Sequence, residues 1–135
     1  MAVHLEFVVL GPPVSNQSPG ANLTSWRGTV AGAATLNWPN PSLTGDLKAI
    51  IINFYAGNRP SVDVDNMSKP ILDVMQNIVY VDDRQIVQAE IAHLKIGAAF
   101  PIMGVRSLIV NSIQSGNPFV YVRIEDPVDP FPLPK

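Results

Sequence analysis

Five aspartates lie in the stretch between residues 61 and 88, and their spacing constrains how the chain can fold. The stretch reads D-x-D-N-x-x-K, then an apolar segment, then D-D-x-Q. Asp63 and Asp65 are two residues apart, so in an extended segment their side chains leave on one side, roughly 6–7 Å apart. Asn66 is a good helix N-cap. The apolar residues that follow recur at helical spacing: Met67, Ile71, Val74, Met75 and Ile78.

We expect this helix to carry the chain back, so that Asp82 and Asp83 lie at the same end as Asp63 and Asp65. Such a group needs compensation, because two carboxylates about 5 Å apart repel by roughly 3 kcal/mol at an effective dielectric near 20. Mg²⁺ favours sites made of carboxylates and water, so a metal site is one interpretation. The other is that these acids cap a helix and occupy turns, each solvated separately. Spacing alone leaves both open.

The acidic stretch resembles the core motif of the RusA family of Holliday-junction resolvases, which reads D-x-D-N-x-x-K-x-x-x-D, a short apolar segment, and D-D-x-Q-[IV]. The residues that match are Asp63, Asp65, Asn66, Lys69, Asp73, Asp82, Asp83, Gln85 and Ile86. Upstream, the segment 11–16 is similar to the family's P-P-S-x-N, with Val14 as an extra residue before Asn16. The resemblance covers roughly residues 3–95 and the last strand.

The resemblance implies a homodimeric, metal-dependent crossover junction endodeoxyribonuclease that resolves four-way DNA junctions by paired nicks in recombination and repair. It implies Mg²⁺, with Mn²⁺ as a substitute, and a bacterial or phage setting. The implied metal ligands are Asp63, Asp65 and Asp83, with Asp82 the less certain of its pair, and Lys69 completes the implied catalytic set. The nucleic-acid contacts expected beside them are Arg59, Lys69, Arg84 and Asn16.

Length and hydrophobic periodicity predict a single domain over residues 1–125, which the resemblance implies is RusA-like, followed by a proline-rich, extended and mobile tail at 126–135. Strands are expected at 3–10, 47–55, 86–95 and 119–124, and helices from Ser25 to Leu36, after Asn66, and at 107–114. The expected fold class is α+β, α/β-like in its order of elements. It has a mixed sheet of about four strands covered by one layer of two or three helices. His93 and Glu90 are placed outside the site, because most of a strand separates them from Asp83.

Composition favours a partner but argues against a simple DNA-binding surface. Charged residues make up 15% of the chain and hydrophobic residues 47%, an apolar excess that a homodimer would cover. The net charge is −2, whereas nucleic-acid binders are usually basic. A non-catalytic DNA-binding or assembly protein that retains the RusA fold is therefore the alternative to the nuclease.

Other classes fit the sequence less well. There is no cysteine, which excludes disulfides and thiolate metal sites. No apolar run reaches the length of a membrane span and no signal pattern begins the chain, so we expect a cytoplasmic protein without a membrane partner. A D-x-D sugar-transferase site would need a nucleotide-binding domain for which 135 residues leave no room. A calcium loop would need a glycine and a glutamate that are absent after Asp63.

Overall fold

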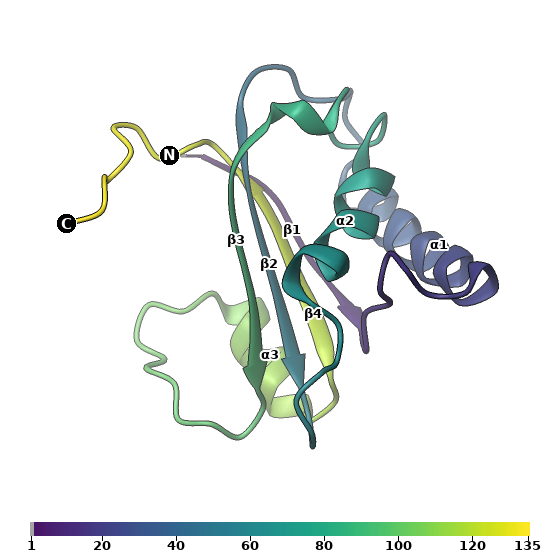
Figure 1. Ribbon diagram of the computed structural model, residues 1–135. Helices are drawn as coiled ribbons and strands as arrows, with labels where there is room; N and C mark the ends of the chain where they lie inside the picture. Colours follow the sequence, from purple (N-terminus) through teal and green to yellow (C-terminus); the bar gives the residue numbers. More distant parts are fainter. Residues whose placement is uncertain (1) are drawn as a thin grey trace.

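The computed structural model describes residues 2–135 and shows a mixed four-stranded sheet with helices on both faces (Figure 1). In chain order the elements are β1 (Val3–Leu10), α1 (Gly20–Asn37), β2 (Leu47–Tyr55), α2 (Val64–Met75), the 3-10 helix η1 (Asp83–Gln85), β3 (Ile86–Lys95), α3 (Ser107–Ser115) and β4 (Phe119–Glu125). The strand order is β1-β4-β2-β3, in which β2 and β3 run parallel and the other pairs antiparallel. The expected α+β class with a mixed sheet is confirmed.

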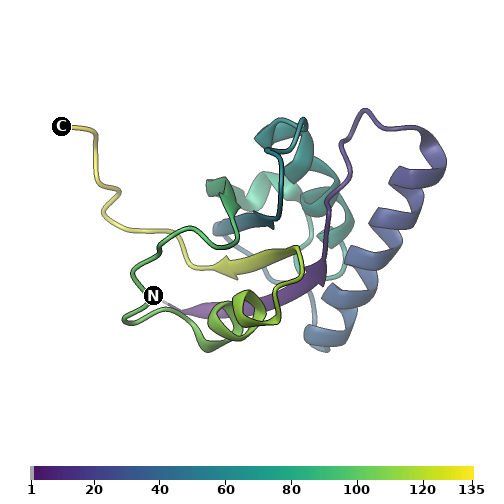
Figure 2. The ribbon, with the colours of Figure 1, turned by 90° about the horizontal axis from the view of Figure 1, so that it is seen from below.

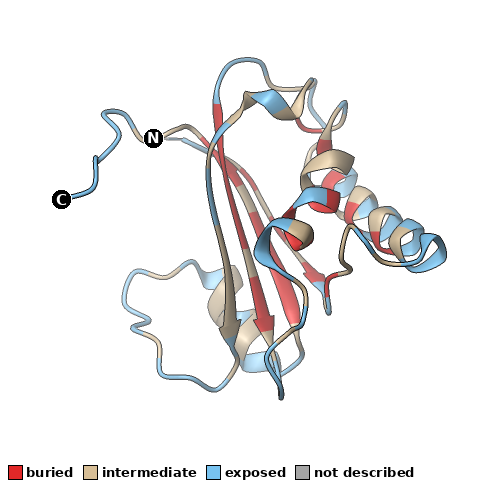
Figure 3. Ribbon diagram, in the orientation of Figure 1, coloured by how far each residue is buried: buried red, intermediate tan, exposed pale blue. Residues whose placement is uncertain are grey.

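Strand β2 lies in the middle of the sheet and is buried along nearly its whole length (Figure 3). Its apolar residues alternate between two cores: Ala49 and Ile51 face one, and Ile50 and Phe54 face the other. A strand that is apolar on both sides needs cover on both faces. The sequence-based expectation of one helical layer is therefore wrong.

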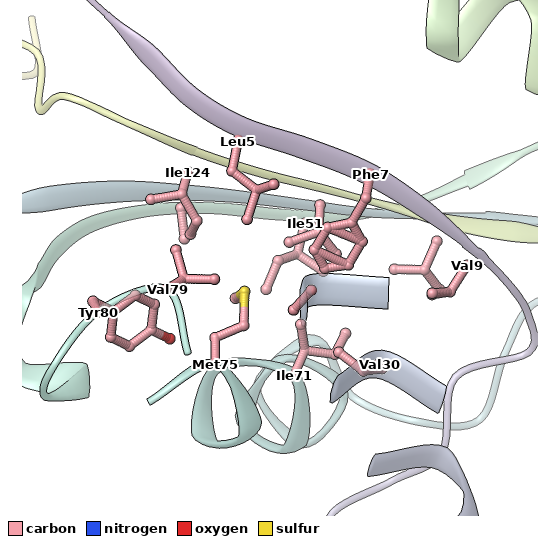
Figure 4. Close-up of a cluster of buried hydrophobic side chains, with 14 of the residues drawn as sticks. Leu5, Phe7, Val9, Val30, Ile51, Ile71, Met75, Val79, Tyr80 and Ile124 are labelled. Carbon is pink, nitrogen blue, oxygen red and sulfur yellow. The ribbon is translucent and has the colours of Figure 1, made fainter. Parts of the chain in front are cut away.

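Helices α1 and α2 cover one face of the sheet, and α3 covers the other (Figure 2). The larger core contains side chains from α1, α2 and the facing strands, among them Phe7, Val30, Ile71 and Met75 (Figure 4). On the opposite face, Phe54 stacks on Phe119 with ring centroids 4.5 Å apart, and apolar residues of α3 pack around them.

Two helix starts differ from the sequence-based expectation. Helix α1 begins at Gly20 rather than Ser25, after Pro19 at the N-cap, and no side chain caps it. Helix α2 begins after Asp63, so Asn66 lies inside the helix rather than at its cap. The end of α3 is as expected, because Gly116 closes it with φ of 79°, a conformation that glycine adopts readily. Within the described part of the chain, no helix is both long enough and apolar enough to cross a membrane.

The tail after β4 contains no helix or strand, and its first residues are attached beside β1 and β3. The Asp126 amide donates to the Ala2 carbonyl at 2.9 Å, and the Asp126 carboxylate lies 2.7 Å from the His4 ring. The side chain of Gln88 donates to the carbonyl of Val128 at 2.9 Å and accepts from its amide at 2.8 Å. This pairing on β3 holds the first residues of the tail, beyond which the proline-rich end extends away from the domain (Figure 1).

Candidate active site

Helix α2 separates the aspartates that the sequence analysis expected to find together. Asp63 occupies the N-cap position of α2 without a side-chain capping bond, and Asp65 lies in its first turn, whereas Asp82 and Asp83 lie at the start of η1, just before β3. Because β2 and β3 are parallel, the connection between them must cross from one end of the sheet to the other. A helix of 12 residues spans roughly 18 Å. The expectation that both pairs lie at the same end is therefore wrong for a single chain.

No three acidic, histidine or cysteine side chains in the described chain come close enough together to hold a metal ion. What remains at the start of α2 is a pair, Asp63 and Asp65, both exposed to solvent. Mg²⁺ is commonly bound by one or two carboxylates, with waters and substrate phosphates as its other ligands. The pair therefore fits an ion that is shared with a phosphate. Asp83 lies outside this pair.

Asp82 has a structural role as the cap of η1. Its carboxylate accepts from the Arg84 amide at 2.9 Å, while the Gln85 side chain accepts from the Asp82 amide at 2.9 Å. The Arg84 amide, followed by the Arg84 guanidinium, holds the pKa of Asp82 below its usual range. The neighbouring Asp83 carboxylate forms no salt bridge within residues 2–135. Of the two adjacent acids, Asp83 is thus the one that no ion pair engages.

Gln85 connects η1 to the loop that precedes β2. Its carbonyl oxygen accepts from the amides of Val81 and Asp82, both at 2.9 Å. Its amide nitrogen donates to the carbonyls of Leu43 at 3.0 Å and Gly45 at 2.9 Å. All of these bonds are to backbone groups, so the glutamine of the D-D-x-Q motif holds two segments of chain together.

Two cations surround Asp73 on the same face of α2 as Asp65. The Lys69 ammonium lies 3.6 Å from one carboxylate oxygen of Asp73, and the Arg27 guanidinium of α1 lies 3.8 Å from the other. Asp65, Lys69 and Asp73 succeed one another at four-residue intervals, which places them on one helix face. Arg27 comes from a different helix, and the sequence analysis did not include it in the site.

Tyr80 places Asp83 at the carboxyl-terminal end of this face. The phenol is buried and donates to the Leu72 carbonyl at 2.5 Å. Burial, then the charges of Asp83 and Asp73, raise the pKa of Tyr80 well above its usual range. The Asp83 amide donates to the Gln76 side chain at 3.1 Å, just after α2 ends. A polar strip therefore runs along α2 from Asp65 towards Asp83.

Pro70 explains how Asn16 reaches the site. A proline inside a helix has no N–H to donate to the carbonyl four residues earlier, here that of Asn66. That carbonyl accepts instead from the backbone amide of Asn16 at 2.9 Å. The loop after β1 is thereby fixed to the first turn of α2, beside Asp65.

His93, which the sequence analysis placed outside the site, contacts the segment that carries Asp63. His93 pairs with Asn53 across β2 and β3, and its Nδ1 lies 3.0 Å from the Asn53 amide nitrogen. Its Nε2 lies 2.8 Å from the carbonyl of Val62, which directly precedes Asp63. With Asn53 donating to Nδ1, the ring donates through Nε2 and ties the Val62 carbonyl to the sheet. A polar Asn53 in an otherwise apolar strand was the available sequence signal.

The four residues expected to contact DNA do not form one patch. Asn16 and Lys69 lie at the start of α2, and the exposed Arg59 stands in the turn between β2 and Asp63. Arg84 lies beyond the other end of α2, where its guanidinium bonds to Asp82 at 3.2 Å. Near the start of α2 the positive charge therefore comes from Lys69 and Arg59, and Arg27 adds to it further along the helix, beside Asp73.

The sequence profile of the endodeoxyribonuclease RusA family matches residues 17–125 of this chain. The matched range begins in the loop before α1, ends with β4 and contains both pairs of aspartates. The comparison with curated proteins finds no significant match. Because the family profile spans most of the chain, the protein belongs to the RusA family of endodeoxyribonucleases.

Proposed function

We propose that this protein is a metal-dependent endonuclease that resolves four-way DNA junctions by paired nicks, acting as a homodimer with one site in each chain. Membership of the RusA family supports cleavage of junction DNA. The observation that carries the assignment to a site is the exposed pair Asp63 and Asp65, with Lys69 one helical turn further on. These are the residue types that phosphodiester hydrolysis requires.

Asp63 and Asp65 are the residues that would hold Mg²⁺ or Mn²⁺ in this site. A bound ion supplies a Lewis acid that polarises the phosphate and makes a water nucleophilic at neutral pH. Both carboxylates lie on the open side of α2, so a DNA phosphate can approach them without displacing a side chain of the core. Without an ion their mutual repulsion is uncompensated, since neither forms a salt bridge within the described residues.

Lys69 and Arg27 are proposed to stabilise the negative charge that develops on the phosphate. Both lie within salt-bridge distance of Asp73 in the absence of DNA, which keeps the two cations close together. The Lys69 side chain is 58% exposed, so its ammonium can move from Asp73 to a phosphate oxygen. Charged donors that are already in position contribute most where charge appears in the transition state.

Asp83 is proposed to take part in cleavage from the far end of the polar strip. Its neighbour Asp82 is used as a helix cap, whereas the Asp83 carboxylate is half-buried and not salt-bridged among the described residues. Lys69 and Arg27 neutralise the nearby carboxylate of Asp73. Asp83 is therefore the acid at this end of the polar strip whose charge no salt bridge compensates. The distinction between Asp82 and Asp83 is therefore directly testable by mutation.

A homodimer is proposed because a four-way junction is symmetric and its resolution requires two cuts. The monomer exposes large apolar side chains, including Met103 at 98% and Ile102 at 63%. Closed two-fold dimers are the commonest way in which such chains assemble. Light scattering should then give about twice the monomer mass of 14.6 kDa.

A panel of DNA substrates tests the proposed function. The protein is incubated with a labelled four-way junction, a nicked duplex and a linear duplex of the same sequence, in Mg²⁺, Mn²⁺ or EDTA. Paired nicks in the junction, dependent on the metal and absent from the linear duplex, are expected. Binding of the junction without cleavage in any metal would instead support the non-catalytic alternative.

A further inference from the structure

A groove of about 600 Å³ opens between the loop after β1, the first turns of α1 and residues 60–62. This volume lies in the range of sites that hold small organic molecules. Its lining mixes apolar side chains, namely prolines, aliphatic residues and Trp26, with polar ones. The polar side chains carry hydroxyl and carboxamide groups and come from Ser15, Ser18, Asn22, Ser25, Thr29 and Ser61.

The groove leads directly to the acid pair. Val62 lines it, and the next residue is Asp63. The carbonyl of Val62 is held by His93 at 2.8 Å, which fixes this wall to the sheet. The opposite wall is fixed where the Asn16 amide meets the Asn66 carbonyl in the first turn of α2. Both walls of the groove are therefore anchored where the phosphate to be cut would lie.

The chemistry of the lining fits a base better than a phosphate. None of the side chains that line the groove is charged, so it offers no countercharge to a phosphate. The cations Lys69 and Arg27 lie instead beside Asp73 on α2. A nucleobase has apolar faces and hydrogen-bonding edges, which matches a lining that combines prolines with hydroxyl groups.

Trp26 joins the groove to the core of the domain, because it lines the groove and also packs in the larger hydrophobic core. Its side chain is 6% exposed. The indole nitrogen is enclosed by protein atoms, so an occupant of the groove can contact the ring of Trp26 but not this donor.

We infer that this groove binds one unstacked base of the DNA strand, next to the phosphodiester that Asp63 and Asp65 act on. The inference rests on the proposed function for the identity of the strand. Removing a base from the helical stack is easiest where pairing is already disturbed. The groove therefore gives the enzyme a means of preferring branched DNA to continuous duplex, through a contact that a fully stacked strand cannot make.

Trp26 can report directly on the occupant of the groove. The chain has two tryptophans, so a Trp38→Phe variant leaves Trp26 as the single emitter. This variant is titrated with an oligodeoxythymidylate and, separately, with an oligomer of equal length made of abasic residues, at constant Ca²⁺ and ionic strength. The base-bearing oligomer is expected to change the Trp26 emission and to bind at least about fivefold more tightly.

Two valine substitutions in α1 test the location. Ser25→Val, made in the Trp38→Phe background, places a larger apolar side chain in the groove and should abolish the preference for the base-bearing oligomer. Its affinity for the abasic oligomer should not change. Thr24→Val is the matched control, because Thr24 is exposed on the same helix but does not line the groove. This control should keep the preference of its parent.

Equal affinity for the two oligomers, or a preference that survives Ser25→Val, would overturn the inference. Neither measurement requires cleavage. A protein that prefers the base-bearing oligomer but never cuts a junction would keep the groove assignment and lose the proposed function. A protein that cuts junctions but binds both oligomers equally would keep the proposed function and lose the groove assignment.

Discussion

Replacing Gln85 by alanine should destabilise the fold strongly without removing a catalytic group. The side chain makes four hydrogen bonds to the backbone, at 2.9, 2.9, 3.0 and 2.9 Å. A hydrogen bond contributes about 0.5–1.5 kcal/mol net to stability. Two of the partners, on Val81 and Gly45, belong to exposed residues and can be hydrated after the change. The lower half of the range therefore applies, and the expected loss for the four bonds is roughly 2–4 kcal/mol.

Thermal unfolding followed by circular dichroism measures this loss. For a domain of this size, 1 kcal/mol corresponds to about 4 °C, so the Tm should fall by roughly 8–16 °C. Gln85→Glu keeps the shape but turns the donors towards Leu43 and Gly45 into an acceptor, so it should be at least as unstable at neutral pH. Gln114→Ala is the control, because Gln114 is exposed and makes no side-chain hydrogen bond in the described chain.

The same variants separate a structural from a catalytic glutamine. Well below its Tm, the Gln85→Ala protein should cleave junctions within about threefold of the wild-type rate, because Gln85 bonds to backbone groups and not to the acid pair. A Tm within about 2 °C of wild type would refute the hydrogen-bond account. Normal stability combined with loss of cleavage would make Gln85 a catalytic residue.

Three further results are expected. Each chain carries a net charge of −2, so an ion bound at the acid pair should aid DNA binding. Exchanging EDTA for Ca²⁺ at constant ionic strength should tighten junction binding at least tenfold, about 1.4 kcal/mol. Equal affinities in EDTA and Ca²⁺ would exclude a role of the ion in binding. His93→Ala releases the Val62 carbonyl and should lower the cleavage rate at least about tenfold. Junction affinity in Ca²⁺ should stay within about twofold of wild type. A parallel loss of cleavage and affinity would indicate a purely structural effect. Burial raises the pKa of Glu6, but hydrogen bonds from Arg106 and Tyr121 outweigh this effect, so the pKa in the folded protein lies below its usual value. Ionised Glu6 therefore stabilises the fold at neutral pH, and this stabilisation is lost as the pH falls through the pKa of Glu6 in the folded protein. The difference in Tm between wild type and Glu6→Gln should therefore shrink from about pH 7 to about pH 3, and a constant difference would exclude the linkage.

The strands were predictable because their pattern depends on local hydrophobicity. The central strand β2 is nearly continuous in apolar residues, and β3 and the C-cap of α3 at Gly116 lie where the sequence places them. The start of α1 was not predictable in the same way. No side chain caps this helix, and its first residue is a glycine. Neither a capping residue nor a good helix former therefore marks its start in the sequence.

The grouping of the aspartates depended on information that is not local. Asp63 and Asp65 share one end of α2 because they are adjacent in sequence. Whether Asp83 joins them depends on the direction of β3 relative to β2, which hydrophobic periodicity does not specify. The position of His93 depends in the same way on strand register, which pairs it with Asn53 beside the loop that carries Asp63.

The motif itself combines residues with different tasks. Asp82 and Gln85 hold η1 in place, and the carbonyl of Asn66 receives the Asn16 loop. A family resemblance does not distinguish such structural residues from catalytic ones. The hydrogen bonds of the structure make the distinction for Asp82, whose carboxylate is already engaged by Arg84.

The most direct test of the account is the rate of junction cleavage in Mg²⁺ by three asparagine variants of the aspartates. Asp65→Asn and Asp83→Asn should each lower the rate at least about a hundredfold, because each removes a carboxylate assigned to the reaction. The metal-free Tm of each variant should hold or rise, because the substitution also removes a charge that no salt bridge compensates in the described chain. Asp82→Asn, in which the side-chain oxygen can still accept from the Arg84 amide and cap η1, should keep a Tm close to wild type and cleave within about threefold of the wild-type rate. Wild-type cleavage by Asp65→Asn would contradict the central claim that the acid pair at the start of α2 carries the reaction.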